Sequence, residues 1–143
     1  MNEIIVAYWT GTGNTQTMAE YVAEGIREGG KTPKVVSVEE ISADELKDAP
    51  VFALGCPSMG VETLEESVME PFVEEVTGFA AGKKIGLFGS YGWGDGEWMR
   101  SWADQMQEAG AEVYGGEDAI CQEAPDEDAQ DDLKELGKEL ASL

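Results

Sequence analysis

Short apolar runs and segments with helical periodicity alternate along this chain. The run Ile4–Ala7 is β-branched and brief, so it predicts a strand over about Glu3–Trp9. Apolar residues then recur at helical spacing and predict a helix over Asn14–Glu28, which the pair Gly29–Gly30 ends. Strands and helices that alternate in this way are typical of a parallel sheet covered by helices on both faces.

The alternation continues along the rest of the chain. Further strands are predicted at Lys34–Val38, at Val51–Leu54, at Lys84–Gly89, and over 112–121 with a bend at Gly115–Gly116. Four further helical segments are predicted: at Ser42–Lys47, from near Ser67, from Asp95 or Gly96 to Gly110, and after Pro125–Asp126. Ser42 and Glu45 would cap the first of these, and Ser67–Glu70 would form a capping box at the start of the second. Two of these helices carry apolar stripes that we expect in the core: Trp98, Met99, Trp102, Ala103 and Met106 on one, and Leu133, Leu136, Leu140 and Leu143 on the other.

The first strand runs into a helix through a loop rich in glycine and hydroxyl groups. Its residues are Thr10, Gly11, Thr12, Gly13, Asn14 and Thr15. Backbone N–H groups at a helix start, together with the helix dipole, favour a phosphate. The loop lacks the Gly-Lys-Ser/Thr ending of a Walker loop, and Gln16 stands where a dinucleotide fingerprint needs its third glycine. It therefore predicts a terminal phosphate held by neutral donors alone; a plain capped turn is the structural alternative.

Composition narrows the class of protein. The 143 residues are enough for one domain with a sizeable core, and 42% of them are hydrophobic. The sequence contains no apolar run long enough to span a membrane and no pattern of a signal peptide, so we expect a cytoplasmic protein. Histidine is absent, which excludes histidine-based catalysis. Cys56 and Cys121 have no metal-ligand spacing, and we expect both as buried free thiols.

The chain is strongly acidic. Its 30 acidic and 9 basic residues give a net charge of −21, which would repel nucleic acids and anionic membranes. Glu62–Glu75 holds six acids and no base, and Glu117–Glu139 holds ten acids and two lysines. Such runs either serve solubility as solvated faces or form a docking surface for a basic protein, and the sequence favours neither.

Three loops together resemble those of the flavodoxins, in particular the short-chain clostridial type. Besides Tyr8–Thr15, the matching segments are Gly55–Gly60 and Gly89–Gly96, each after a predicted strand. The likeness runs from Ile4 to about Leu140. It implies a flavodoxin-like α/β fold, a doubly wound three-layer sandwich whose five parallel strands lie in the order 2-1-3-4-5, with residues 1–143 as a single FMN-binding domain. In a sheet with this strand order, the loops after strands one, three and four open at one edge, which also predicts a pocket there.

The resemblance implies a role for each loop. Residues 10–15 would hold the FMN phosphate, Ser58 would meet the ribityl chain, and Met59 and Trp93 would flank the flavin ring. Gly60 would supply a peptide that flips on the first reduction of the flavin. Val61 would bias this peptide toward the flipped form, because β-branched residues resist positive φ. Glu62 would contact the N3 edge of the ring. The remaining expected contacts are Ser90, Tyr91, Gly92 and Gly94. Gln122–Glu123 would close the rim. Trp9 would either border the phosphate end of the site or, as an aromatic residue that closes a strand, belong to the core.

The function implied is a low-potential one-electron carrier, and not an enzyme. It would shuttle non-covalent FMN between semiquinone and hydroquinone, because the loops offer no cation to stabilise an anionic ring. It would dock as a monomer, transiently, to basic patches of reductases and oxidoreductases. An FMN-dependent quinone or NAD(P)H reductase of the same fold is the alternative, and a flavin-free adaptor is a third. A phosphorylatable receiver domain is excluded, since Thr10–Thr12 and Cys56–Pro57 stand where its acids are needed.

Overall fold

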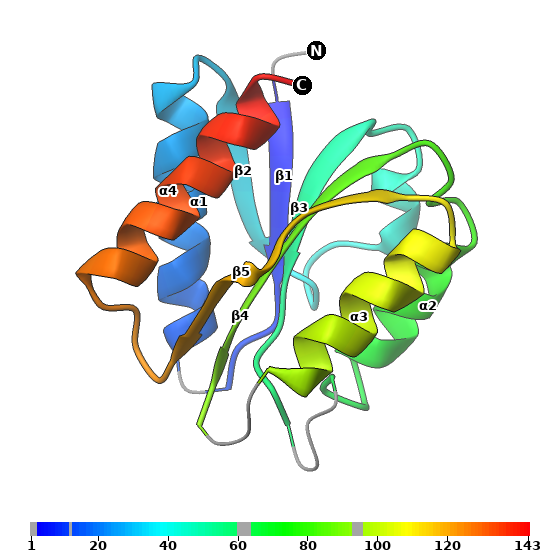
Figure 1. Cartoon of the computed structure of the whole chain (residues 1–143). Helices are drawn as coiled ribbons and strands as arrows, with labels where there is room; N and C mark the ends of the chain where they lie inside the picture. Colours follow the sequence, from blue (N-terminus) through cyan, green and yellow to red (C-terminus); the bar gives the residue numbers. More distant parts are fainter. Residues whose placement is uncertain (1–2, 12, 60–63, 93–95) are drawn as a thin grey trace.

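A computed structural model describes residues 3–11, 13–59, 64–92 and 96–143. Its central feature is a sheet of five parallel strands in the order β2-β1-β3-β4-β5 (Figure 1). The strands are β1 (Glu3–Tyr8), β2 (Thr32–Ser37), β3 (Val51–Gly55), β4 (Lys84–Tyr91) and β5 (Glu112–Gln122). The helices are α1 (Asn14–Glu28), the 3-10 turn η1 (Ala43–Leu46), α2 (Met69–Thr77), α3 (Glu97–Glu108) and α4 (Glu127–Ala141). The predicted fold class and strand order are confirmed.

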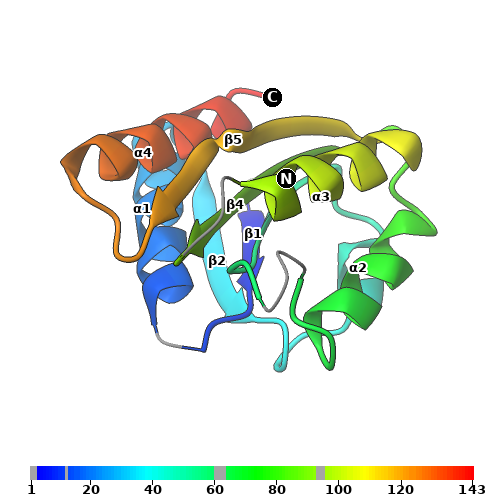
Figure 2. The ribbon, with the colours of Figure 1, turned by 60° about the horizontal axis from the view of Figure 1, so that its bottom comes forward.

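Helices cover both faces of the sheet. Helices α1 and α4 lie on one face, whereas α2, α3 and η1 lie on the other (Figures 1 and 2). Strand β3 shows why both faces are apolar: Phe52 and Leu54 belong to the core under α2 and α3, while Ala53 belongs to the core under α1 and α4. A strand buried on both sides reads as a continuous apolar run, as β3 does. Within the described residues, no helix is long and apolar enough to cross a bilayer.

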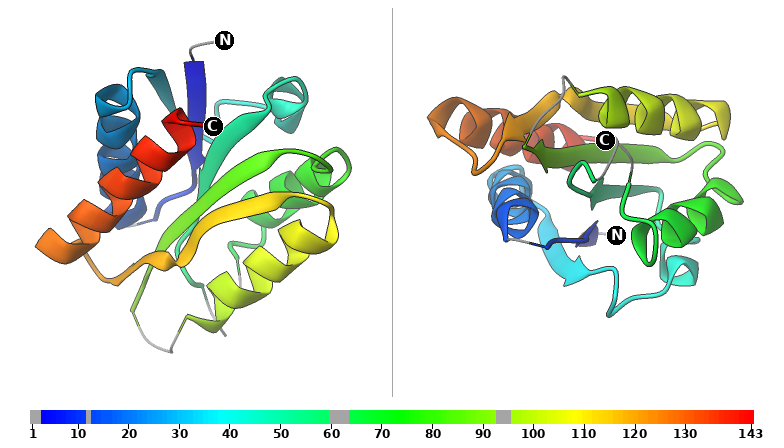
Figure 3. Two further views of the ribbon diagram at one scale, coloured as in Figure 1. Left: turned by 45° about the horizontal axis from the view of Figure 1, so that its top comes forward. Right: turned by 90° about the horizontal axis from the view of Figure 1, so that it is seen from below.

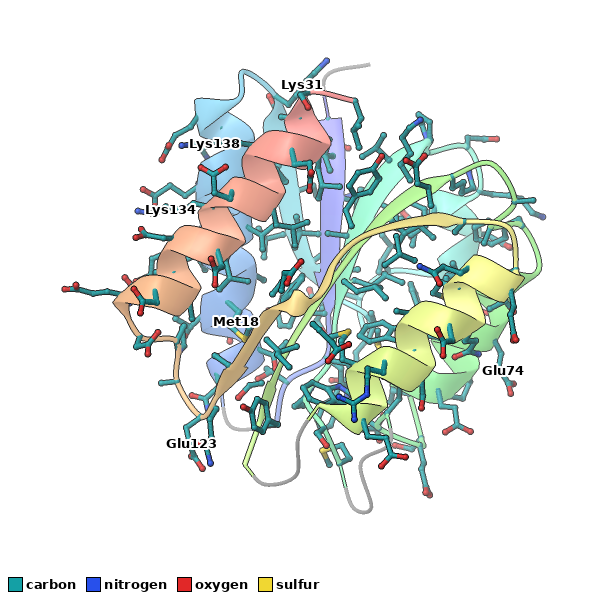
Figure 4. All side chains as sticks on the ribbon, viewed as in Figure 1. Met18, Lys31, Glu74, Glu123, Lys134 and Lys138 are labelled. Atoms are coloured by element: carbon teal, nitrogen blue, oxygen red, sulfur yellow. The ribbon has the colours of Figure 1, made fainter. Side chains whose placement is uncertain are left out.

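Helices α1 and α4 pack unusually close together. A Cβ on Gly25 would lie 2.0 Å from the carbonyl oxygen of Lys134, and a Cβ on Gly137 would lie 2.1 Å from that of Val22. Around this contact, lysines of α4 pair with glutamates of α1 (Figure 4): Lys134 Nζ with Glu24 Oε1 at 3.5 Å, and Lys138 Nζ with Glu28 Oε1 at 3.4 Å. The two glycines thus allow one helix backbone to rest on the other.

The ends of the elements lie within two residues of the predicted ones, and two other features differ. Leu133, Leu136 and Leu140 are buried as expected, but α4 ends at Ala141 and the side chain of Leu143 is 42% exposed. Leu143 was therefore wrongly placed in the inner stripe. Strand β5 is one element, and its pairing with β4 shifts register between Leu87 and Gly89, opposite the glycine pair that predicted a bend.

The cap of α2 is the second difference. The predicted capping box, Ser67–Glu70, is wrong: the helix begins at Met69, and the carboxylate of the buried Glu65 takes the role. It accepts hydrogen bonds from the N–H groups of Ser67 at 3.0 Å, Val68 at 2.7 Å and Met69 at 3.0 Å, and from the Ser67 hydroxyl. Burial alone would raise the pKa of Glu65, but these hydrogen bonds outweigh it and lower the pKa to about 2.

We expect Glu65→Gln to destabilise the protein by about 1 to 3 kcal/mol near pH 7, because the amide loses the charge that strengthens these bonds. The folded pKa lies below the ordinary value of 4.5, so the stabilisation is complete above pH 4.5 and is lost as the pH falls toward 2. Urea unfolding of parent and variant at several pH values should show the difference shrinking over that range. The exposed neighbour Glu66 provides the control, Glu66→Gln. A difference that persists undiminished at pH 2.5 would contradict this reading.

Candidate functional site

The carboxyl ends of β1, β3 and β4 surround a cavity of about 300 Å³. These strand ends lie at the edge of the sheet that faces the viewer in the right-hand view of Figure 3. The walls are Trp9, Gly11, Asn14, Pro57, Ser58, Met59, Ser90, Tyr91, Gly92 and Glu123. Eight of these are residues that the sequence predicted for the site or its rim: Gly11, Asn14, Ser58, Met59, Ser90, Tyr91, Gly92 and Glu123. The fold therefore brings the described parts of all three loops to one cavity.

The β1–α1 loop and the first turn of helix α1 carry hydrogen-bond donors suited to an anion. Gly13 takes φ 99°, a left-handed conformation that favours glycine, and its N–H donates to Thr10 Oγ1 at 2.9 Å. Thr15, in the first turn of α1, is 1% exposed, and its Oγ1 has no hydrogen-bond partner among the described residues. The first N–H groups of a helix also lack intrahelical acceptors. These donors fit a phosphate group, which would satisfy the hydroxyl as well.

Backbone hydrogen bonds continue the pairing of the sheet into the loops that follow β1 and β3. Ser58 N–H donates to the Ser90 carbonyl at 2.9 Å, which continues the β3–β4 pairing past the end of β3. Trp9 N–H donates to the Gly55 carbonyl at 3.0 Å and extends the β1–β3 pairing in the same way. The cavity walls are therefore continuations of central strands, which gives them a rigid support.

The end of β5 closes one side of the cavity. Among the described residues, Glu123 is the one non-glycine residue with a positive φ, 61°. Its N–H donates to the Tyr91 carbonyl at 2.8 Å, and its own carbonyl accepts from Ser90 Oγ at 2.6 Å. Gln122 Nε2 donates to the Gly92 carbonyl at 3.2 Å. These contacts place the Glu123 carboxylate at the tip of β5, beside the cavity (Figure 4).

The other predicted site residues have two different outcomes. Thr10, Gly13 and Thr15 belong to the β1–α1 loop and first helical turn but are not among the cavity walls. The remaining ones lie outside the described residues: Thr12, Gly60, Val61, Glu62, Trp93 and Gly94. Sequence reasoning did not single out Pro57. For Trp9 it left open a place at the border of the site or in the core, and Trp9 both lines the cavity and packs against the core under α2 and α3. Strand β1 ends at Tyr8, so Trp9 already belongs to the loop, where it is half-buried in the cavity wall.

The described walls of the cavity include no lysine or arginine, and Glu123 is their one charged residue. The two thiols are buried and unreactive: burial raises the pKa of Cys56 to about 12, and burial with the nearby Asp126 carboxylate raises that of Cys121 to about 11. In the part of the chain that the structure describes, no cluster of acidic residues and cysteines has a metal-binding arrangement. The described walls offer groups suited to binding: neutral donors suit a phosphate, and a thioether and aromatic rings suit a flat ring system.

Comparison with known proteins agrees with this arrangement. The family model described as flavodoxin matches residues 6–137. A flavodoxin of Clostridium beijerinckii is 47% identical over 138 residues, which cover 96% of this chain and 99% of that protein. A flavodoxin of Megasphaera elsdenii is 43% identical over 136 residues, covering 95% of this chain and 96% of that protein.

A solved structure agrees at the level of the fold. The solution structure of two-electron reduced Megasphaera elsdenii flavodoxin superposes with a TM-score of 0.90 at 42% sequence identity. The superposition covers 98% of this chain and 99% of that chain.

Proposed function

The chain belongs to the flavodoxin family, and from that premise we propose that residues 1–143 form one FMN-binding domain that acts as a low-potential one-electron carrier. The family is one of FMN-binding electron-transfer proteins rather than enzymes. When bound, the flavin supplies the electron chemistry, and the protein supplies binding, orientation and charge.

The observation that carries the proposal is that three strand-end loops meet at one cavity, close to the Thr15 hydroxyl, which has no hydrogen-bond partner among the described residues. The phosphate would lie at the start of α1, against Asn14 and Thr15. The ring would lie between the β3 loop with Met59 and the β4 loop with Tyr91. Ser58 would meet the ribityl chain, and Ser90 would line the ring's pyrimidine edge. The roles expected for Thr12, Gly60, Val61, Glu62, Trp93 and Gly94 are part of the proposal and rest on the sequence alone.

The charge of the cavity supports cycling between semiquinone and hydroquinone. A second reduction adds negative charge to the ring unless a proton follows. The described walls contain no cation that would stabilise this charge, and the Glu123 carboxylate repels it. Neutral donors also leave the charge of the phosphate uncompensated. Both effects oppose the second electron, so the second reduction occurs at low potential.

Docking is proposed to use acidic side chains around the exposed edge of the flavin together with those of helix α2. Helix α2 carries Glu70, Glu74 and Glu75 and no basic residue, and Glu74 points away from the sheet (Figure 4). A basic patch on a reductase or oxidoreductase complements such a surface, and salt screens the attraction. The protein would meet these partners as a monomer and release them after each transfer.

Anaerobic stepwise reduction with dithionite of the FMN-loaded protein tests the proposal. We expect the flavin bands to pass through a stable blue neutral semiquinone and to bleach only at low potential. Direct passage to the fully reduced form, with steady NADH oxidation by the protein alone, would assign it to the reductases instead. Failure of the apoprotein to take up FMN would remove the proposal altogether.

A further inference from the structure

Trp98 connects three segments beneath the cavity. It lies in the first turn of α3, is 1% exposed, and its Nε1–H donates to the Cys56 carbonyl at 3.2 Å. Its ring also contacts that of Tyr91, with centroids 5.7 Å apart and planes inclined by 52°. Cys56 immediately precedes three residues of the cavity wall, and Tyr91 is itself part of that wall. A single side chain thus touches the supports of both ring-binding loops.

The backbone makes room for this contact at Gly89. A Cβ there would lie 2.2 Å from the Cys56 carbonyl oxygen and 3.0 Å from Cζ2 of Trp98. Both distances are shorter than ordinary van der Waals contacts. The close approach of the indole to Cys56 therefore depends on the absence of a side chain at position 89.

We propose that Trp98 is a positioning residue of the cofactor site, an inference that rests on the proposed function. Its hydrogen bond holds the Cys56 peptide, and with it Pro57, Ser58 and Met59, in the binding arrangement before the flavin arrives. A segment that is ordered in advance loses less entropy when the ligand binds. Without the bond, that ordering cost falls on the binding step.

The same helix provides a matched control. Trp102 lies one turn after Trp98 in α3 and is also 1% exposed, but its Nε1 has no hydrogen-bond partner among the described residues. Changing either tryptophan to phenylalanine removes the same atoms from the same core. Only Trp98→Phe removes a bond to the β3 loop.

The test is flavin binding to the apoproteins of Trp98→Phe, Trp102→Phe and the parent, measured by quenching of flavin fluorescence, with urea unfolding in parallel. We expect Trp98→Phe to weaken binding about tenfold, the equivalent of one hydrogen bond. The loss should be equal for FMN and riboflavin, because Trp98 lies away from the phosphate loop. Trp102→Phe should bind as the parent does, and it should lose less stability than Trp98→Phe because it breaks no hydrogen bond.

Equal affinities of the two variants, or a loss confined to FMN, would overturn the inference. A parent that binds no FMN would instead refute the proposed function. If Trp98→Phe does not fold, 3-benzothienylalanine at position 98 keeps the ring and replaces only the N–H by sulfur. This analogue should also bind flavin about tenfold more weakly, and binding as tight as in the parent would show that the bond has no positioning role.

Discussion

Gly25→Ala is expected to lower the free energy of unfolding by about 3 kcal/mol, at the upper end of the effects of overpacking. The new methyl group would lie 2.0 Å from the backbone oxygen of Lys134, so α1 and α4 must separate to admit it. A flexible side chain could turn aside, but a helix backbone cannot. In an open helix the same substitution would stabilise by about 1 kcal/mol, since alanine is the better helix former.

Urea unfolding followed by circular dichroism measures this effect. Gly137→Ala should behave in the same way, because its Cβ would lie 2.1 Å from the Val22 carbonyl. Gly78→Ala is the control: this glycine has right-handed helical angles, and its Cβ would meet only the Glu75 carbonyl, at 3.2 Å. Similar stabilities for Gly25→Ala and Gly78→Ala would show that the two helices are not in such close contact.

Thr15→Val is expected to weaken FMN binding by about ten- to a hundredfold, the range for a hydrogen bond to a charged group. Valine keeps the shape of threonine and removes the buried Oγ1, which has no other partner among the described residues. Riboflavin lacks the phosphate, so its affinity should not change. Stability of the apoprotein should not fall either, because an unsatisfied buried hydroxyl contributes nothing favourable to folding.

Calorimetric titration of both flavins into parent and variant measures the difference. Thr17→Val is the control: Thr17 lies two residues further along α1 and its hydroxyl is already bonded to the Gly13 carbonyl, at 3.0 Å. A loss of affinity shared by FMN and riboflavin would place the effect of Thr15 in the fold of the loop. No loss for FMN would remove Thr15 from the phosphate site.

Features set by local sequence were predicted well. The bounds of α1 agree to the residue, because Gly29 and Gly30 stop a clear helical period. The cavity could be located in advance, because parallel strands of this order bring certain loops to one edge whatever their side chains. The described loop residues that meet there, such as Asn14, Met59 and Tyr91, follow from topology.

Features set by tertiary contacts were not predictable in this way. Glu65 caps α2 from outside the helix, and a buried glutamate has no distinctive sequence signal when Ser67 offers a more familiar cap. Trp9 reads as the apolar end of a strand until the strand is seen to stop at Tyr8. The positive φ of Glu123 is held by hydrogen bonds to β4, and the residue type at this position does not predict it.

The shift of register in β5 has a consequence for the edges of the sheet. Strands β5 and β2 are the outer strands, and an open edge is a template on which further chains can add. At β5 the ladder is interrupted beside the exposed carboxylates of Glu117 and Asp118, and at β2 Pro33 supplies no N–H. An added strand would meet an irregular strand on one side and a residue without an N–H on the other. Edge-to-edge aggregation is therefore opposed at both ends of the sheet.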